Sequence, residues 1–151
     1  MFHEIVDGAG GADPADDAGD TVEAAALLAS FETVVREAVE DAGRDRVVDR
    51  TGLETATVEA AAGGDAANLT LEEGASVLAA AADRDAETVV AEVRDHLLMG
   101  MATAVLDVDT ISTAIDADLT GQEVQQVLEG RAAMTLEQLA EVAAVIETRK
   151  P

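Results

Sequence analysis

Apolar residues recur along most of this chain with the period of an α-helix, and no segment shows the sustained alternation of a β-strand. The two longest apolar faces lie in residues 21–43 (Val22, Ala26, Leu27, Phe31, Val34, Val35, Ala38 and Val39) and 85–104 (Val89, Val90, Val93, Leu97, Leu98 and Met101). The same pattern predicts shorter helices over residues 44–52, 53–62, 70–82, 110–117, 122–129 and 135–147. We therefore expect an all-α, compact multi-helix domain with no sheet.

Capping boxes predict where several of these helices begin. In such a box the first side chain accepts a hydrogen bond from the N–H three residues on, and the second side chain reaches back. The pairs with this spacing are Asp20 with Glu23, Thr70 with Glu73, Thr120 with Glu123 and Thr135 with Gln138. Aspartates at Asp85 and at Asp107 or Asp109 supply two further N-caps, and Gly43 ends the first long helix.

The second half of the chain repeats the layout of the first. Two short helices followed by a Thr-Leu-Glu helix start predict a helix-turn-helix, in which apolar residues after the turn hold the second helix to the core. Val48 aligns with Ala114, Leu53 with Leu119, Val58 with Val124, Ala61 with Val127 and, after one residue of slippage, Thr70-Leu71-Glu72 with Thr135-Leu136-Glu137.

These patterns divide the chain into three parts. Residues 1–20 are rich in Asp, Gly and Ala, and we expect a disordered acidic tail there rather than a metal site at Asp13, Asp16 and Asp17. Residues 21–84 form a first helical unit, a helix plus a degenerate helix-turn-helix. Residues 85–151 form a second, a long helix plus a helix-turn-helix, and the two tandem units are expected to pack together as one domain.

Residues 110–147 resemble the helix-turn-helix domains of the Cro and phage-repressor class. The resemblance rests on the helix 122–129, the turn at Gly130 and the helix start Met134-Thr135-Leu136. The whole chain is also similar to a family of small acidic proteins of unknown function from halophilic archaea. The second resemblance implies a fold and a compartment, but no activity.

The repressor resemblance implies that three glutamines read DNA. The base-reading positions of that family correspond here to Gln122, Gln125 and Gln126, and a glutamine amide can form two hydrogen bonds with adenine. Arg131, just beyond this helix, is the expected phosphate contact. A homodimer is expected with this function, because one such helix covers only a half-site.

The chain departs from the repressor pattern in ways that favour the second unit as the reader. Val48 is bulkier than the alanine usual at the helix crossing, and the base-reading positions of the first unit hold Thr55, Ala56, Glu59 and Ala60, which offer little to a base. In the second unit Asp118 replaces the turn glycine found at Gly52, although aspartate tolerates the left-handed conformation better than most residues.

Charge argues against DNA binding. Between Asp107 and Thr148 nine acids face the single base Arg131, a net charge of −8. Affinity for DNA comes largely from neutralised phosphates, and this unit has almost nothing with which to neutralise them. Molar salt weakens that electrostatic contribution for every protein, so the objection is reduced in a salt-loaded cell but not removed.

The residues that usually carry chemistry are sparse. The chain has no cysteine, its serines lie outside any nucleophile-elbow motif, and its two histidines, His3 and His96, are far apart in the sequence. A structural role explains His96 better than catalysis, and core packing explains Met99 and Met101 better than a methionine-rich partner groove. We therefore expect no enzyme, no catalytic residue, no metal site and no cofactor.

Composition predicts a cytoplasmic protein adapted to high salt. The chain carries 32 acids against 9 bases, a net charge of −23, which molar salt would screen. Its start lacks the features of a signal peptide, and its longest nearly apolar run, residues 97–106, is half of the ~20 residues that span a bilayer. We expect no contact with a membrane.

Two functions remain open from the sequence. The first is a DNA-binding transcriptional regulator that reads double-stranded DNA through Gln122, Gln125 and Gln126. The second is a protein-interaction or scaffold module in which the helix-turn-helix units serve packing only. An exposed, acid-free recognition face would favour the first, and a buried face the second.

Overall fold

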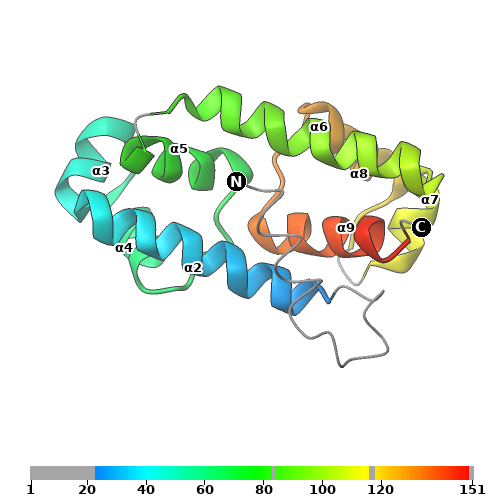
Figure 1. Ribbon diagram of the computed structural model, residues 1–151, viewed down its shortest axis with the longest axis horizontal. Coiled ribbons are helices and arrows are strands. Elements are labelled where there is room, and N and C mark those ends of the chain that lie inside the picture. The colour runs from blue at the N-terminus through cyan, green and yellow to red at the C-terminus, as the bar shows by residue number, and fades with distance from the viewer. Residues whose placement is uncertain (1–22, 83, 116–117, 150–151) are drawn as a thin grey trace.

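The computed structural model describes residues 23–82, 84–115 and 118–149, and within these ranges the chain forms eight α-helices and no strand (Figure 1). The prediction of an all-α domain is confirmed. The helices are α2 (Ala24–Ala42), α3 (Arg44–Thr51), α4 (Thr55–Ala62), α5 (Leu71–Ala82), α6 (Ala86–Ala104), α7 (Val108–Ala114), α8 (Gly121–Glu129) and α9 (Leu136–Arg149). The predicted acidic tail, residues 1–20, lies outside the described residues.

Local chemistry explains where most helices begin. Thr120 and Glu123 form both hydrogen bonds of their capping box. The boxes at Thr70 and Thr135 are also complete, and Asp85 and Asp107 cap α6 and α7. The box predicted at Asp20 falls outside the described residues; α2 begins at Ala24, with Glu23 as an N-cap that makes no side-chain hydrogen bond.

Left-handed residues end three of the helices. Gly52 and Gly130 close α3 and α8 with φ of 72° and 81°, a conformation that glycine adopts without steric cost. Val105 closes α6 with φ of 55°, and it is the one non-glycine residue with positive φ in the described ranges. Asp118 therefore does not adopt the left-handed conformation: α7 ends at an extended Ile115 instead, and a longer connection leads to α8.

The chain folds as two successive four-helix arrangements, α2 to α5 and α6 to α9. Both begin with a helix of 19 residues, followed by two short helices and a longer one. Buried positions correspond throughout: Leu27 with Val89, Phe31 with Val93, Val35 with Leu97, Ala38 with Gly100, Val58 with Val124, Ala61 with Val127 and Leu71 with Leu136.

One pair in the sequence alignment is wrong. Val48 lies half-buried in the middle of α3, whereas Ala114 is exposed at the last position of α7. The buried residues of these two helices are Val47 and Ile111. Val47 therefore corresponds to Ile111, two residues earlier than the sequence alignment places its counterpart. The offset arises because the α7–α8 connection is longer than the α3–α4 connection.

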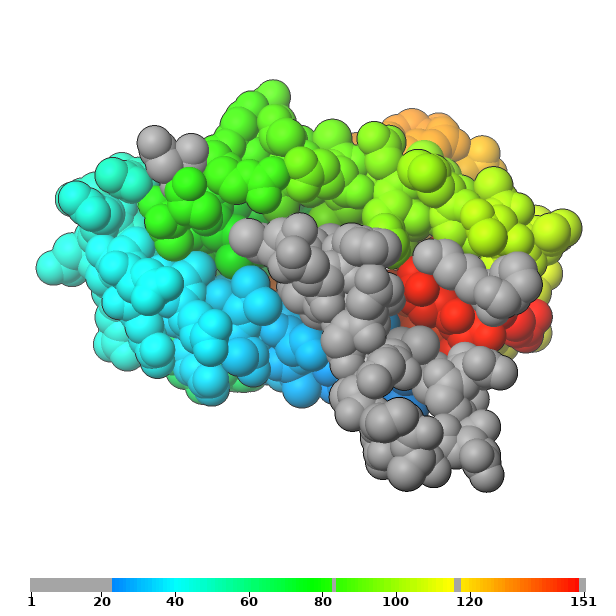
Figure 2. Space-filling view, in the orientation of Figure 1, coloured from blue at the N-terminus to red at the C-terminus, as the bar shows by residue number. Residues whose placement is uncertain are grey.

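The two halves pack crosswise. Helix α2 contacts α9 as well as its own α5, and α6 contacts α5 as well as its own α9. Both long helices lie along the face shown in Figure 2, α2 below and α6 above. Buried apolar residues from both halves form one continuous cluster. Burial of this shared surface is the main stabilising contribution that the structure shows.

Candidate functional site

Helix α8 presents the predicted glutamines on its outer side. Its apolar residues Val124, Val127 and Leu128 are buried, which turns the opposite face of this amphipathic helix towards solvent. Gln122 and Gln125 are exposed, and Gln126 is half-buried. The structure thus brings the three glutamines together on one short helix, as the sequence predicted.

An acid occupies the same face. The Gln125 Nε2 group donates to Glu129 Oε1 at 2.9 Å, and the Arg131 guanidinium forms an ion pair with Glu129 at 3.1 Å. The expected phosphate contact is therefore already neutralised by a neighbouring carboxylate. The face is exposed, but it is not acid-free.

The corresponding face of the first half offers no better surface for DNA. On α4, Thr55, Ala56 and Glu59 are exposed and Ala60 is half-buried, and none of them is cationic. Nearby, Arg50 donates to the carbonyl of Ala80 at 2.7 Å, so this arginine ties α3 to the end of α5.

A groove that the sequence did not predict lies between α5, α6 and α8. Apolar side chains line part of it: Val90, Ala91 and Leu98 from α6 and Leu128 from α8. Leu98 is 46% exposed, whereas every other leucine in the described residues is buried or half-buried. Carboxylates surround these residues, namely Glu72, Glu87, Asp95 and Glu129.

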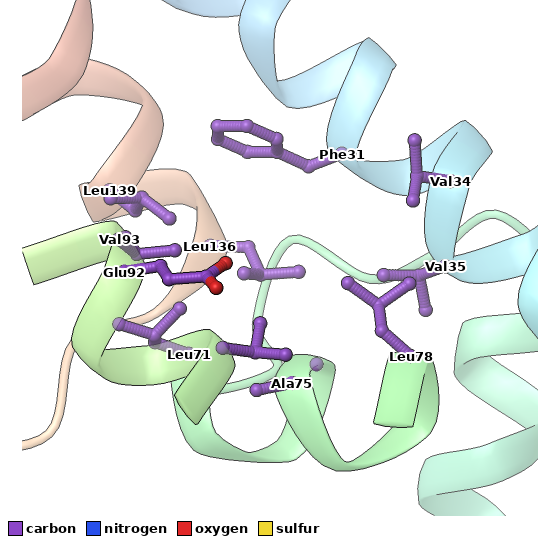
Figure 3. Close-up of a pocket in the computed structure, with 12 residues that line it drawn as sticks. Phe31, Val34, Val35, Leu71, Ala75, Leu78, Glu92, Val93, Leu136 and Leu139 are labelled. Atoms are coloured by element: carbon purple, nitrogen blue, oxygen red, sulfur yellow. The ribbon is translucent and has the colours of Figure 1, made fainter. Parts of the chain in front are cut away.

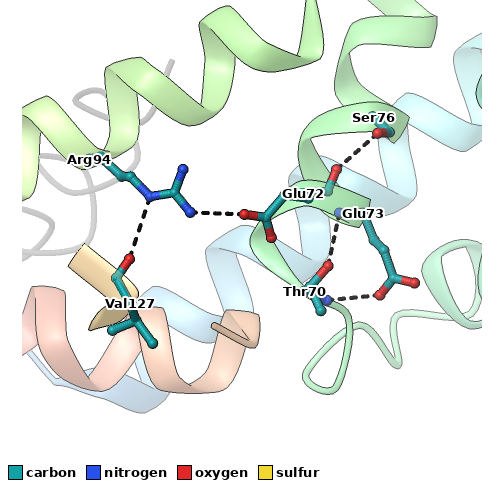
Figure 4. Close-up of polar contacts among 6 residues, drawn as sticks. All are labelled: Thr70, Glu72, Glu73, Ser76, Arg94 and Val127. Atoms are coloured by element: carbon teal, nitrogen blue, oxygen red, sulfur yellow. Dashed lines mark hydrogen bonds and ion pairs between the residues drawn. The ribbon is translucent and has the colours of Figure 1, made fainter. Parts of the chain in front are cut away.

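Arg94 joins the three helices that form this groove. Its Nη2 group donates to Glu72 Oε1 of α5 at 2.8 Å, and its Nε group donates to the carbonyl of Val127 in α8 at 3.4 Å (Figure 4). The side chain is only 19% exposed. Through these two hydrogen bonds the partly buried guanidinium links α6 to α5 and to α8. The groove is therefore a preformed feature of the fold.

A small apolar pocket of about 50 Å³ lies where the two halves meet (Figure 3). Phe31 and Val93, which occupy corresponding positions in the two halves, both line it, as do Leu71 and Leu136. Gly74 also lines it, where an added Cβ would meet the Leu136 side chain at 3.5 Å. Glu92, ion-paired with Arg84, contributes the one carboxylate of this otherwise apolar lining.

His96 has a structural partner. Its Nε2 atom lies 3.0 Å from Glu147 Oε1, and the two side chains, 17% and 12% exposed, connect α6 to α9. Among the residues that the structure describes, no group of three or more His, Asp or Glu side chains is placed to hold a metal ion. No single described helix is long and apolar enough to cross a membrane, although α6 and α7, bent by 96°, pass that test as a pair.

Comparison with known proteins gives a family but no activity. Residues 27–149 match the model of a family described as a family of unknown function (DUF5791). The matched range begins in the first turn of α2 and ends at the last residue of α9, so it includes the helices described above except for the first three residues of α2. No curated protein and no solved structure matches the chain.

Proposed function

The chain belongs to the DUF5791 family of unknown function, and we propose that it is a non-enzymatic protein that binds another protein through the groove between α5, α6 and α8. The observation that carries this proposal is the groove itself, in which the exposed side chains of Ala91 and Leu98 lie between helices that Arg94 links together. Contiguous exposed apolar surface rimmed by polar residues is typical of protein-interaction sites.

DNA readout is the second candidate, and the exposure of Gln122 and Gln125 favours it. Both side chains can reach a partner, and Gln126 lies beside them. The ion pair between Arg131 and Glu129 and the net charge of the second half weigh against it, since few phosphates can be neutralised. We therefore place DNA binding, with or without a homodimer, behind protein binding.

The same proposal places the protein in the cytoplasm of a cell that accumulates salt. The net charge of −23 supports this placement, because at ~1 M salt the Debye length is only ~3 Å and the carboxylates repel one another weakly. The likeness of residues 110–147 to repressor-class helix-turn-helix domains remains part of the proposal, supported by the succession of α7, α8, Gly130 and α9.

Affinity capture with matched variants tests protein binding. The tagged full-length chain would be expressed in its source cells, and captured proteins identified by mass spectrometry for wild type, Leu98→Glu and Met99→Glu. Leu98 lines the groove, whereas Met99, 70% exposed on the same helix, does not. We expect one or more specific partners that are lost with Leu98→Glu and retained with Met99→Glu. The same proteins captured by all three would contradict the proposal.

Enrichment of genomic DNA tests the second candidate. Fragments would be captured in molar KCl by wild type and by the double variant Gln122→Ala/Gln126→Ala. Readout by the glutamines predicts that sequence-specific enrichment disappears in the variant. Equal enrichment by both proteins would end this candidate.

A further inference from the structure

We propose that the partner segment bound by the groove is a cationic amphipathic helix. This inference rests on the proposed function and adds the chemical class of the partner. Two features of the groove lead to it: its length along α6, and the carboxylates that have no counter-ion within the described part of the chain.

The groove follows one face of α6 for about three turns. The residues of α6 that line it include Glu87, Val90, Ala91, Arg94, Asp95 and Leu98. Their spacing of three and four residues places them on one stripe of the helix. From Glu87 to Leu98 the stripe is roughly 16 Å long at ~1.5 Å per residue, which is the length of three turns of a partner helix.

The four carboxylates of the groove are not equivalent. Glu72 is paired with Arg94, and Glu129 is paired with Arg131. The exposed side chains of Glu87 and Asp95 have no ion pair or hydrogen bond from a cation of the described chain. Two uncompensated carboxylates therefore lie on this stripe of α6, one on each side of Ala91 and roughly 12 Å apart along the helix axis.

A helix with two basic residues seven or eight positions apart complements this arrangement. Its arginine or lysine heads would reach Glu87 and Asp95, and their aliphatic stems would lie along Ala91 and Leu98. Apolar residues between the two basic positions, on the same face, would cover the exposed side chains of Ala91 and Leu98, beside which Val90 and Leu128 lie buried. A neutral or acidic helix would leave both carboxylates uncompensated at the edge of an interface, which disfavours it.

A synthetic peptide tests this class of partner directly. The probe is a fluorescent 16-residue helical peptide with two arginines eight positions apart and three leucines between them on the same face. Its binding to the full chain is measured by fluorescence anisotropy at the lowest KCl concentration at which circular dichroism shows the wild type and every variant folded. A second peptide carries glutamines in place of the arginines.

Matched variants separate the groove from the overall negative charge. We expect Glu87→Gln/Asp95→Asn to weaken binding about tenfold, as the loss of two partly desolvated ion pairs would. The control Glu37→Gln/Asp41→Asn makes the same change of charge on exposed residues of α2, and its affinity should stay within about twofold of wild type. Leu98→Ser should abolish binding, whereas Met99→Ser should leave it unchanged.

The possible failures are distinguishable. Equal weakening by the two charge variants would show that the peptide responds to net charge alone, and it would overturn the inference. Equal affinity of the arginine and glutamine peptides, with Leu98→Ser still defective, would overturn the cationic class while leaving protein binding through the groove intact. If substitution of Leu98 reduced neither the affinity for the peptide nor the capture of cellular partners, the proposed function would be overturned as well.

Discussion

Thr70 and Thr135 face each other across an isolated antiparallel bridge. The N–H of Leu71 donates to the carbonyl of Met134, the N–H of Leu136 donates to the carbonyl of Leu69, and both bonds measure 2.8 Å. The two threonines begin corresponding helices, so Leu71 corresponds to Leu136 and Leu69 to Met134. The two hydrogen bonds are therefore equivalent under exchange of the two halves. An approximate twofold axis therefore passes between the two threonines.

The two threonine caps should contribute equally to stability. Thr70 accepts from the N–H of Glu73 and Thr135 from the N–H of Gln138, both at 3.1 Å. We expect Thr70→Ala and Thr135→Ala each to lower the free energy of unfolding by about 1 kcal/mol, because each leaves an N-terminal N–H without its acceptor. Urea midpoints would measure this, with Thr→Ser at each position as the control that keeps the hydroxyl. Indistinguishable alanine and serine variants would contradict the account.

Replacement of Val105 by glycine should stabilise the protein. Val105 has a left-handed backbone, which is strained for a β-branched residue, and its side chain is 89% exposed. Val105→Gly removes that strain and gives up almost no buried surface, so we expect a gain of about 1 kcal/mol in the free energy of unfolding. A lower urea midpoint for the glycine variant would show that the backbone at this helix end is not strained.

Asp107 should make stability depend on pH in the acid range. The N–H of Thr110 donates to Asp107 Oδ1 at 2.8 Å and holds the pKa of this carboxyl below its usual value. The contribution of the Asp107 carboxylate to the free energy of unfolding is therefore fully present above its unfolded pKa of about 3.9. It is lost as the pH falls through the lower pKa of the folded state.

Asparagine at position 107 can still accept the capping hydrogen bond, but it does not titrate. We expect the wild type to lose stability relative to Asp107→Asn as the pH is lowered through the acid range, in urea unfolding at matched salt. A difference between the two proteins that stays constant from neutral to acid pH would contradict this assignment.

Salt should stabilise the folded chain. Thirty-two acids against nine bases repel one another in dilute buffer, and the few ion pairs of the described residues compensate for only a small part of this charge. Because the Debye length falls from ~10 Å at 0.1 M to ~3 Å at 1 M, we expect the melting temperature to rise steadily with KCl. A melting temperature independent of KCl would remove the support for a high-salt cytoplasm.

Local signals made the helices predictable. The spacing of Thr70 with Glu73 and of Thr135 with Gln138 is sufficient to locate the starts of α5 and α9, since a capping box involves only residues three apart. The outward face of α8 follows from its apolar period in the same way. The contact of Gln125 with Glu129 also has a local signal, because residues four apart lie side by side on one helix.

Crosswise packing and the groove were not predictable from local patterns. The correspondence of α2 with α6 has a sequence signal, since Leu27, Phe31 and Val35 have the same spacing as Val89, Val93 and Leu97. Their packing against helices of the other half depends on contacts between residues far apart in the chain. The groove takes its lining from three helices of both halves, so no single stretch of sequence indicates it.

Cross-linking from inside the groove tests the central claim most directly. A photoreactive amino acid at Ala91, an exposed residue of the groove, is compared in living cells with the same amino acid at Glu37, exposed on α2. Binding through the groove predicts a discrete protein adduct from position 91 that is absent from position 37 and is lost when Leu98→Glu is added. An adduct formed equally from both positions, or no protein adduct from position 91, would contradict the claim.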